Sequence, residues 1–200
     1  MEQVESVIFD WGGVLIDDPA LGLVKFCAEA LGVSEEAYTR AHGKFGPDFQ
    51  KGLIPEEAFW AGVCGELRRP KPDVPSLWGS AFRSVYSPRE EVFSLARQLH
   101  EKGTKIALLS NTEAPAMRYF HEQGYDMFDV PVFSCAEGAR KPERRVYELT
   151  LTRLGSLPEQ SVFVDDKQQY IDGARDAGLH TILFKDVDQV RAELAGLGVG

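Results

Sequence analysis

Four polar clusters of this chain, three of them directly after apolar runs and one at the start of an expected helix, carry carboxylates, hydroxyls, an amide and a lysine. They are Asp10-Trp-Gly-Gly13, Ser110-Asn-Thr112, Arg140-Lys-Pro142 and Asp165-Asp166. Carboxylates brought together from the first and last clusters would repel one another unless a cation lay between them, and hard oxygen ligands suit Mg2+. The residue types therefore predict a carboxylate site that holds Mg2+.

The apolar runs before these clusters indicate the elements that must position them. Five short runs are continuous rather than alternating, which is typical of strands buried on both faces of a parallel sheet. They occupy residues 7–9, 106–109, 131–133, 162–164 and 181–184, the third being the weakest candidate. Helical segments separate them, which favours an α/β fold with a doubly wound parallel sheet, because parallel neighbours need crossover helices. Ligands of such sheets bind beyond the carboxyl ends of the strands, where Asp10 and Asp165 would meet.

Three of the expected helices have clear ends. Ser87-Pro-Arg-Glu90 has the pattern of a capping box at the start of one helix. The inner stripe of that helix would be Val92, Leu95, Ala96 and Leu99. A second helix follows Lys141-Pro142 and ends at Gly155, and a third ends at Gly178, since glycine commonly terminates helices.

Residues 17–87 interrupt the sheet pattern. Their apolar residues recur with helical period and include no run typical of a parallel strand. The expected inner positions are Leu21, Val24, Ala28 and Leu31 before Gly32, then Phe59 and Val63 after Pro55. We interpret 17–87 as a helical cap domain over the carboxyl edge of the sheet, and 1–16 together with 88–200 as the core domain.

The composition excludes several classes of protein. The 200 residues include 31 acidic and 22 basic side chains, and the formal net charge of -9 argues against a nucleic-acid partner. No apolar run approaches the ~18 residues of a membrane span, and the acidic N-terminus lacks the basic region of a secretory signal. We therefore expect a cytoplasmic protein with no membrane partner. Three widely spaced cysteines without a CxxC pair predict neither disulfides nor a zinc site.

Four segments resemble, in order, the four motifs of the haloacid dehalogenase (HAD) superfamily. They are Val7-Ile-Phe-Asp-Trp-Gly-Gly-Val-Leu15, Leu109-Ser-Asn-Thr112, Arg140-Lys-Pro-Glu143 and Val162-Phe-Val-Asp-Asp166. The resemblance covers the whole chain. Residues 141–186 and the cap segment 52–59 are most similar to the subfamily IA-like branch that contains alpha-glucose-1-phosphate phosphatase.

This resemblance implies a Rossmann-like core with a C1-type cap and a Mg2+-dependent phosphatase for a small phosphorylated metabolite, with a sugar phosphate as one candidate. Asp10 would attack the phosphorus, and water would then hydrolyse the aspartyl phosphate, which divides one difficult displacement into two easier ones. By resemblance, Mg2+ would be held by Asp10, the backbone carbonyl of Gly12 and Asp166, with Asp165 helping directly or through water.

The same resemblance assigns the residues that bind the substrate. Ser110 and Asn111, with the backbone N–H groups that follow, would hold the phosphoryl oxygens, and Lys141 would stabilise the charge of the transition state. The cap would select the leaving group. There the segment His42-Gly-Lys-Phe-Gly46 is expected at the opening of the site, where His42 or Lys44 would meet a polar leaving group.

Two positions depart from the pattern of typical HAD phosphatases. Gly12 stands where a second Asp usually serves as general acid and base, a role worth ~10²–10⁴ in rate. Asp17 or a cap residue is the candidate substitute, although Asp17 also suits a turn or hinge. Tyr170 stands where relatives often have Asn. Two alternatives therefore stay open: a weak or inactive HAD-fold protein with a binding or regulatory role, and a haloacid dehalogenase that uses Asp10 on carbon without a metal.

Overall fold

Five parallel strands form the centre of the computed structural model, which describes residues 4–199. The strands are β1 (Ser6–Phe9), β2 (Lys105–Ser110), β3 (Val130–Phe133), β4 (Ser161–Asp165) and β5 (His180–Leu183). Their order across the sheet is β3-β2-β1-β4-β5, and every neighbouring pair is parallel. The expected doubly wound α/β sheet is confirmed, including its weakest strand.

Helices connect the strands and also fill a long insertion after β1. The insertion holds α1 (Ala20–Leu31), α2 (Glu35–Gln50), α3 (Glu56–Leu67) and α4 (Leu77–Val85). The remaining helices are α5 (Glu90–Glu101), α6 (Ala114–Glu122), α7 (Ser134–Glu137), α8 (Arg144–Leu154), α9 (Gln168–Asp176) and α10 (Val187–Gly196), with a 3-10 turn at Pro158–Gln160. No helix within residues 4–199 has both the length and the apolar character that crossing a membrane requires.

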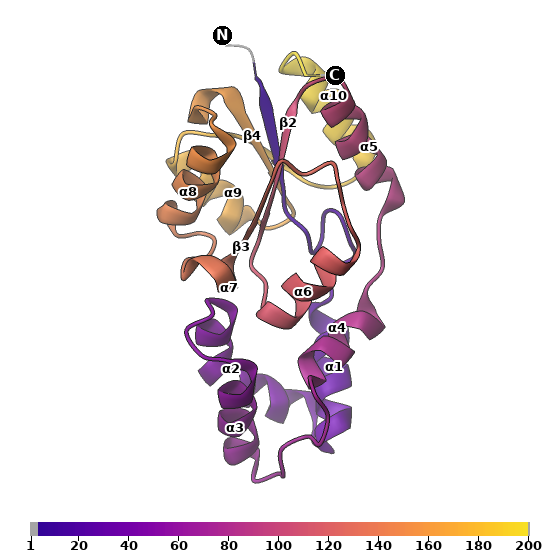
Figure 1. Cartoon of the computed structure of the whole chain (residues 1–200), viewed down its shortest axis with the longest axis vertical. Helices are drawn as coiled ribbons and strands as arrows, with labels where there is room; N and C mark the ends of the chain where they lie inside the picture. The colour runs from indigo at the N-terminus through magenta and orange to yellow at the C-terminus, as the bar shows by residue number, and fades with distance from the viewer. Residues whose placement is uncertain (1–3, 200) are drawn as a thin grey trace.

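The sheet is covered on both faces, which explains why its strands are continuously apolar. Successive side chains of a strand point to opposite faces. Val7 and Phe9 pack in one apolar cluster with residues of α5 and α10, whereas Ile8 packs in a second cluster with residues of α8 and α9. Figure 1 shows these two helix pairs on opposite sides of the sheet. All four residues of β1 are therefore buried.

The helix boundaries confirm most of the sequence expectations and correct one. The helix after Lys141-Pro142 ends at Gly155, which adopts a left-handed conformation with φ 60°. The expected inner stripe of α5 is buried. The capping box is wrong, because α5 begins after Arg89 and Ser87 Oγ instead donates to Asp17 Oδ2 at 2.8 Å. Pro88 pairs with Ile16 in an isolated bridge rather than starting the helix.

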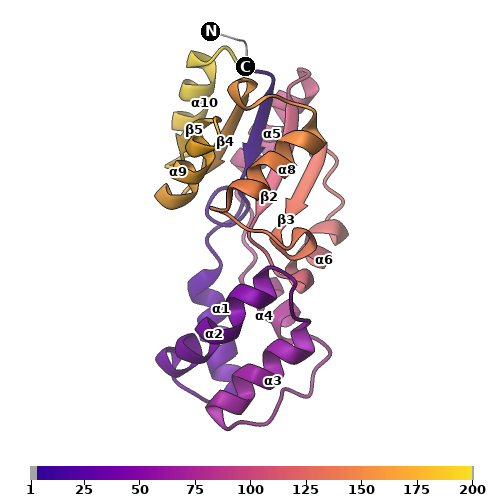
Figure 2. The ribbon, with the colours of Figure 1, turned by 90° about the vertical axis from the view of Figure 1, so that its left-hand side faces the viewer.

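The helices α1–α4 lie together beyond the carboxyl ends of the strands, as Figures 1 and 2 show from two directions. The chain leaves and re-enters the sheet region at neighbouring points, since Asp17 N donates to Ser87 O and Arg89 N donates to Leu15 O, both at 2.9 Å. We refer to residues 17–87 as the helical insertion.

The buried face of α1 differs from the expected one at a single position, Leu21. Leu21 is 82% exposed, whereas Leu23 and Cys27 are buried together with Ala28 and Leu31. The residues expected in α3, Phe59 and Val63, are both fully buried. The expected inner side of α1 is therefore confirmed at Val24, Ala28 and Leu31 and wrong at Leu21, while Leu23 and Cys27 widen the buried side.

Candidate active site

A buried lysine lies between two carboxylates at the carboxyl end of the sheet. Asp10 directly follows β1, Asp165 ends β4, and Lys141 comes from the loop before α8. Lys141 Nζ lies 2.7 Å from Asp10 Oδ1 and 2.7 Å from Asp165 Oδ2, and its side chain has no exposed surface. The N–H of Trp11 also donates to Asp10 Oδ1 at 2.7 Å. These contacts fix the Asp10 carboxylate in one orientation.

Burial and charge act against each other in this cluster. Burial raises the pKa of Asp10, the ammonium group of Lys141 lowers it, and the nearby Asp165 raises it further. For Lys141, burial alone would lower the pKa, but the carboxylates of Asp10 and Asp165 outweigh it and hold the pKa above its ordinary value. Lys141 therefore carries a fixed positive charge in a site from which water is largely excluded.

A third carboxylate completes an acidic cluster. Asp10, Asp165 and Asp166 each offer an oxygen within 4.8 Å of the others. Among the described residues, the buried atom Asp166 Oδ1 finds no hydrogen-bond partner, and burial raises the pKa of this carboxyl group. Gly13 permits the approach of Asp166, because a Cβ at Gly13 would lie 2.4 Å from the Asp166 carboxylate. Hard oxygen donors with one unpartnered member fit a cation such as Mg2+.

The residues after β2 line the same site, but they are engaged differently. Ser110 is buried, and its hydroxyl lies 2.5 Å from that of Thr112. The Asn111 side chain holds the backbone of Lys141 on both sides, accepting from Lys141 N at 2.8 Å and donating to Lys141 O at 3.0 Å. Asn111 thus positions the loop of Lys141, and both Ser110 and Asn111 line the cavity described below.

Tyr170 lies beside Lys141 and Asn111. The Lys141 ammonium lies 5.0 Å from the centre of the Tyr170 ring, and Asn111 Nδ2 donates to Tyr170 Oη at 3.3 Å. An aromatic face at this distance attracts a cation. Tyr170 therefore supports the position and charge of Lys141.

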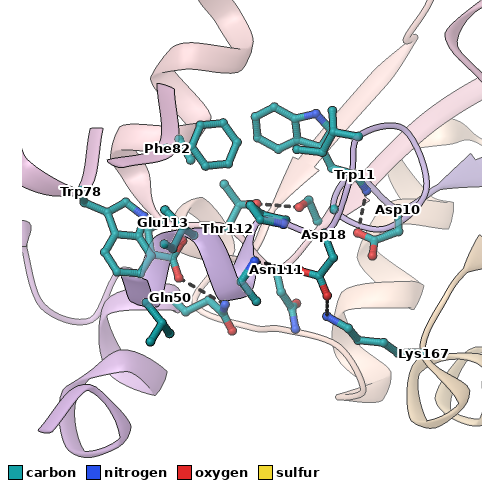
Figure 3. Close-up of a pocket in the computed structure, with 18 of the residues that line it drawn as sticks. Asp10, Trp11, Asp18, Gln50, Trp78, Phe82, Asn111, Thr112, Glu113 and Lys167 are labelled. Atoms are coloured by element: carbon teal, nitrogen blue, oxygen red, sulfur yellow. Dashed lines mark hydrogen bonds and ion pairs between the residues drawn. The ribbon is translucent and has the colours of Figure 1, made fainter. Parts of the chain in front are cut away.

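A cavity of about 220 Å³ connects this cluster to the helical insertion. Figure 3 shows Asp10 and Lys167 at one end of it and Gln50, Glu113 and Trp78 at the other. The cavity is lined by both site residues and insertion residues, among them Asp10, Gly12, Ser110, Asn111, Lys141, Leu23, Tyr38, His42 and Phe82. The predicted phosphate and nucleophile residues thus meet at one end of a pocket that the insertion closes.

The structure separates the two residues expected to contact the leaving group. His42 lines the cavity and stacks on Trp78, with ring centres 5.7 Å apart. Lys44 lies outside it, beside another hollow of α2 and α3, where it pairs with Glu66. Since His42 and Lys44 lie on the same helix only two residues apart, they point to different sides of α2.

The two acidic residues that follow the first motif differ in their position relative to the cavity. Asp17 lies outside the cavity, where it pairs with Arg89 at 2.9 Å and accepts from Ser87. Asp18, by contrast, lines the cavity and lies 3.6 Å from Lys167. The hinge role considered for Asp17 is the one that its contacts support.

Sequence reasoning missed Glu113 and its partner from the insertion. The Glu113 carboxylate is 8% exposed and accepts from Gln50 Nε2 at 3.2 Å, while Gln50 Oε1 accepts from Arg140 at 2.9 Å. Burial raises the pKa of Glu113 to about 7, against the opposing effects of its own backbone N–H, Gln50, Trp78 and Arg140. A glutamate at the beginning of a helix resembles an ordinary exposed charge near a helix N-terminus, so the sequence offered no signal.

The fold and the site together define a hydrolase of the HAD class. A family model for haloacid dehalogenase-like hydrolases matches residues 4–178, and the chain belongs to this family. It is 31% identical over 202 residues to acyl-CoA dehydrogenase family member 10 of Mus musculus, covering 96% of this chain but only 19% of the mouse protein. The chain thus spans about a fifth of that relative's length.

Two further proteins cover most of both chains. The sesquiterpene phosphatase astK of Aspergillus oryzae is 25% identical over 177 residues, which cover 88% of this chain and 87% of that protein. A HAD family enzyme of Bacteroides thetaiotaomicron, solved with magnesium and inorganic phosphate, has a TM-score of 0.75 at 21% identity, covering 91% of this chain and 94% of that one. The latter likeness concerns the fold alone.

Proposed function

We propose that this protein is a Mg2+-dependent phosphomonoesterase that hydrolyses a small phosphorylated metabolite through an aspartyl phosphate on Asp10. The observation that carries the proposal is the buried Asp10–Lys141–Asp165 cluster, with Asp166 beside it, at one end of a cavity closed by the helical insertion. The relative from Aspergillus oryzae, which its name describes as a phosphatase, supports the same reaction class.

Asp10 has the position and the partners that a nucleophile needs. Its carboxylate oxygen would attack the phosphorus as the bond from phosphorus to the leaving alcohol breaks, which leaves an acyl phosphate on Asp10. Water would then break the new phosphorus–oxygen bond, releasing phosphate and restoring the carboxylate. Lys141 holds its charge beside Asp10 without exposure to water, so it can stabilise a phosphoryl group during both steps. Ser110 would bind one phosphoryl oxygen.

The acidic cluster is the site that we assign to Mg2+. Asp10, Asp166 and the backbone carbonyl of Gly12 would hold the ion, with Asp165 helping directly or through water. When bound, Mg2+ would neutralise negative charge on the carboxylates and the phosphate so that the two anions can approach. Asp165 already orients Lys141, so its main contribution is the position of that ammonium group.

Gly12 has no side chain, so the proton for the leaving group would come from water, from the substrate or from a side chain at another position. Asp18 replaces Asp17 as the candidate, because Asp18 lines the cavity and Asp17 does not. Its partner Lys167 lies at the same end of the cavity as Asp10 in Figure 3. We therefore expect slower turnover of esters of poorly acidic alcohols than of aryl esters, whose leaving groups need no proton.

Phosphate release from a set of phosphomonoesters tests the proposal. The wild-type protein should release phosphate with Mg2+ and stop when the ion is chelated, and Asp10→Asn should lose at least ~10³-fold in rate. Asp17→Asn is the matched control, because it removes a nearby carboxylate that lies outside the cavity. Equal rates for wild type and Asp10→Asn would refute the assignment of the nucleophile.

Two alternatives make different predictions. A binding or regulatory protein without catalysis, suggested by Gly12, should form no covalent adduct at Asp10 and should release no phosphate. A haloacid dehalogenase should release halide from 2-haloacids without Mg2+. The three-carboxylate cluster argues against the dehalogenase, because that chemistry requires no metal and the repulsion among the carboxylates would serve no purpose.

A further inference from the structure

The walls of the cavity beyond the Asp10 end are mainly apolar. The helical insertion contributes aliphatic side chains from α1 and aromatic side chains from α2 and α4. These are Leu23 and Val24, Tyr38, Trp78 and Phe82. The sheet side adds Ile16 and Ala116 to the same walls. We refer to this part of the cavity as the apolar chamber.

Among the described residues, the polar side chains that line the cavity are only partly paired: Trp11 Nε1, Tyr38 Oη and Trp78 Nε1 are buried without a hydrogen-bond partner, whereas Gln50 and Asp18 have partners. Gln50 donates to Glu113 and accepts from Arg140, so both ends of its amide are used. At the other end of the cavity, Asp18 lies within ion-pair distance of Lys167. The three unpartnered atoms could bond a single hydroxyl or carbonyl group of a ligand. A ligand with many hydroxyl groups would have to replace the contacts of Gln50 and Asp18 as well, because buried hydroxyls without partners cost free energy.

His42 behaves as part of the aromatic wall. Its ring stacks on Trp78 with an angle of 15° between the planes, and it lies 5.6 Å from Phe59, edge to face. Burial lowers the pKa of His42, so the ring is neutral near neutral pH. His42, the one histidine that lines the cavity among residues 4–199, therefore offers no positive charge to a polar or anionic leaving group.

We propose that the apolar chamber takes the organic part of the substrate, and that the substrate is the monophosphate of an apolar alcohol with an alkyl, alkenyl or aryl chain. This inference rests on the proposed function for the phosphoryl end of the substrate. A sugar phosphate, which the sequence resemblance favours, would place several hydroxyls against Leu23, Val24 and Phe82. An apolar chain instead gains free energy from burial against the same side chains.

Binding of non-hydrolysable alkylphosphonates tests this inference independently of turnover. Calorimetric titrations with ethyl-, butyl- and hexylphosphonate in the presence of Mg2+ should show an affinity that rises about fourfold for each methylene entering the chamber. The heat-capacity change of binding should become more negative along the same series, because apolar surface leaves water. In turnover, hexyl phosphate should have a higher kcat/KM than glucose 6-phosphate, although both are esters of primary alcohols.

Two leucines of α1 provide a matched pair of variants. Leu23 lines the chamber and is 9% exposed, whereas Leu21 lies on the same helix and is 82% exposed. Leu23→Asn should weaken hexylphosphonate binding at least tenfold and change the affinity for inorganic phosphate less than twofold, whereas Leu21→Asn should change neither. Val24→Thr, which nearly conserves side-chain volume, serves as the second chamber variant if Leu23→Asn does not fold.

The outcomes separate the inference from the function on which it rests. Affinities that do not change with chain length, or a higher kcat/KM for glucose 6-phosphate, would overturn the apolar substrate class while leaving the phosphatase intact. Phosphonates that bind with the expected dependence on chain length, together with no hydrolysis of any ester, would overturn the phosphatase and leave the apolar chamber supported.

Discussion

Gly13 lies where any side chain would collide with the Asp166 carboxylate, and its φ of 94° is one that other residues rarely adopt. Gly13→Ala should therefore displace Asp166 and disturb the acidic cluster. We expect a loss of at least ~10²-fold in phosphate release, and a loss of stability above the ~1–2 kcal/mol that a left-handed non-glycine residue costs. Steady-state kinetics and thermal unfolding measure the two effects.

Gly103→Ala is the control for this variant. Gly103 has a similar φ of 92°, but a Cβ there would meet nothing within 4 Å. The control should lose stability from backbone strain alone and keep its activity. If both variants kept full activity, Gly13 would have no part in positioning Asp166.

Glu113 makes the stability of the protein depend on pH. Its pKa is raised from an ordinary value of 4.5 to about 7, so the folded state binds this proton more tightly than the unfolded state. The stabilisation is complete below pH ~4.5 and is lost as the pH rises through ~7, amounting to about 3 kcal/mol at about 1.4 kcal/mol per pKa unit. Chemical unfolding at pH 5 and pH 8 should show this loss in the wild type.

Glu113→Gln removes the titration but keeps an oxygen that can accept from Gln50. The variant should lose less stability than the wild type between the two pH values, because all other groups titrate alike in both proteins. If the free energy of unfolding changed equally between pH 5 and pH 8 in the wild type and the variant, Glu113 would already be ionised in the folded protein at pH 5.

At this scale, the sequence predicted the residues with distinctive motif positions and missed those defined by burial. Asp10, Lys141 and Asp166 come together as expected because they follow strands or precede a helix at one edge of the sheet. Glu113 was missed because only tertiary packing distinguishes a buried carboxylate from an exposed one. The sequence predicted that Asn111 binds the phosphate, and it did not predict that the Asn111 side-chain amide also hydrogen-bonds the backbone of Lys141.

Among the elements, α2 makes a polar contact between the insertion and the sheet region through its last residue. The Gln50 side chain joins Glu113 and Arg140, and its backbone carbonyl accepts from Ser134 Oγ at 2.6 Å. Gln50→Ala should destabilise the protein by about 1–3 kcal/mol, because it leaves buried polar partners unpaired. Hydrogen exchange should accelerate at the C-terminal end of α2.

Gln123→Ala is the matched control, since the Gln123 side chain is exposed and makes only a local contact with Tyr119. It should leave hydrogen exchange in α2 unchanged. Equal exchange rates in the Gln50 variant and the wild type would mean that apolar packing alone holds α2 against the sheet region.

The elements also show what periodicity can and cannot predict. The strands were found because burial on both faces leaves a continuous apolar run, as in β1. The predicted capping box at Ser87 was wrong because the Ser87 hydroxyl donates to Asp17, 70 positions away in sequence, and local sequence does not reveal such a partner. In α1, periodicity predicted Val24, Ala28 and Leu31 correctly but placed Leu21 instead of Leu23 inside, because the two leucines are equally apolar and only tertiary packing against α2 and α4 distinguishes them.

At the scale of the whole molecule, the proposed ion would join β1 to β4 through Asp10 and Asp166. Any ligand that binds only the folded state stabilises it, by about 2.7 kcal/mol at a concentration 100 times Kd. Mg2+ should therefore raise the Tm of the wild type by several degrees, given ~2–4 °C per kcal/mol for a chain of this size. Thermal scans with Mg2+ and with a chelator measure the shift.

The Asp166→Asn variant provides the comparison for this measurement. It replaces the carboxylate whose buried oxygen lacks a partner with an amide that binds cations more weakly. Its Tm should rise much less with Mg2+ than that of the wild type. The same shift in both proteins would place the ion elsewhere.

If the proposed reaction is correct, Asp10 carries the phosphoryl group during turnover. The most direct measurement is mass spectrometry of peptides from protein that is quenched in acid during reaction with a phosphomonoester and Mg2+. We predict one phosphoryl group on the peptide that contains Asp10, and none in Asp10→Asn. Phosphate release at the wild-type rate with no adduct on that peptide in any time point, or an adduct on a different residue, would contradict this prediction.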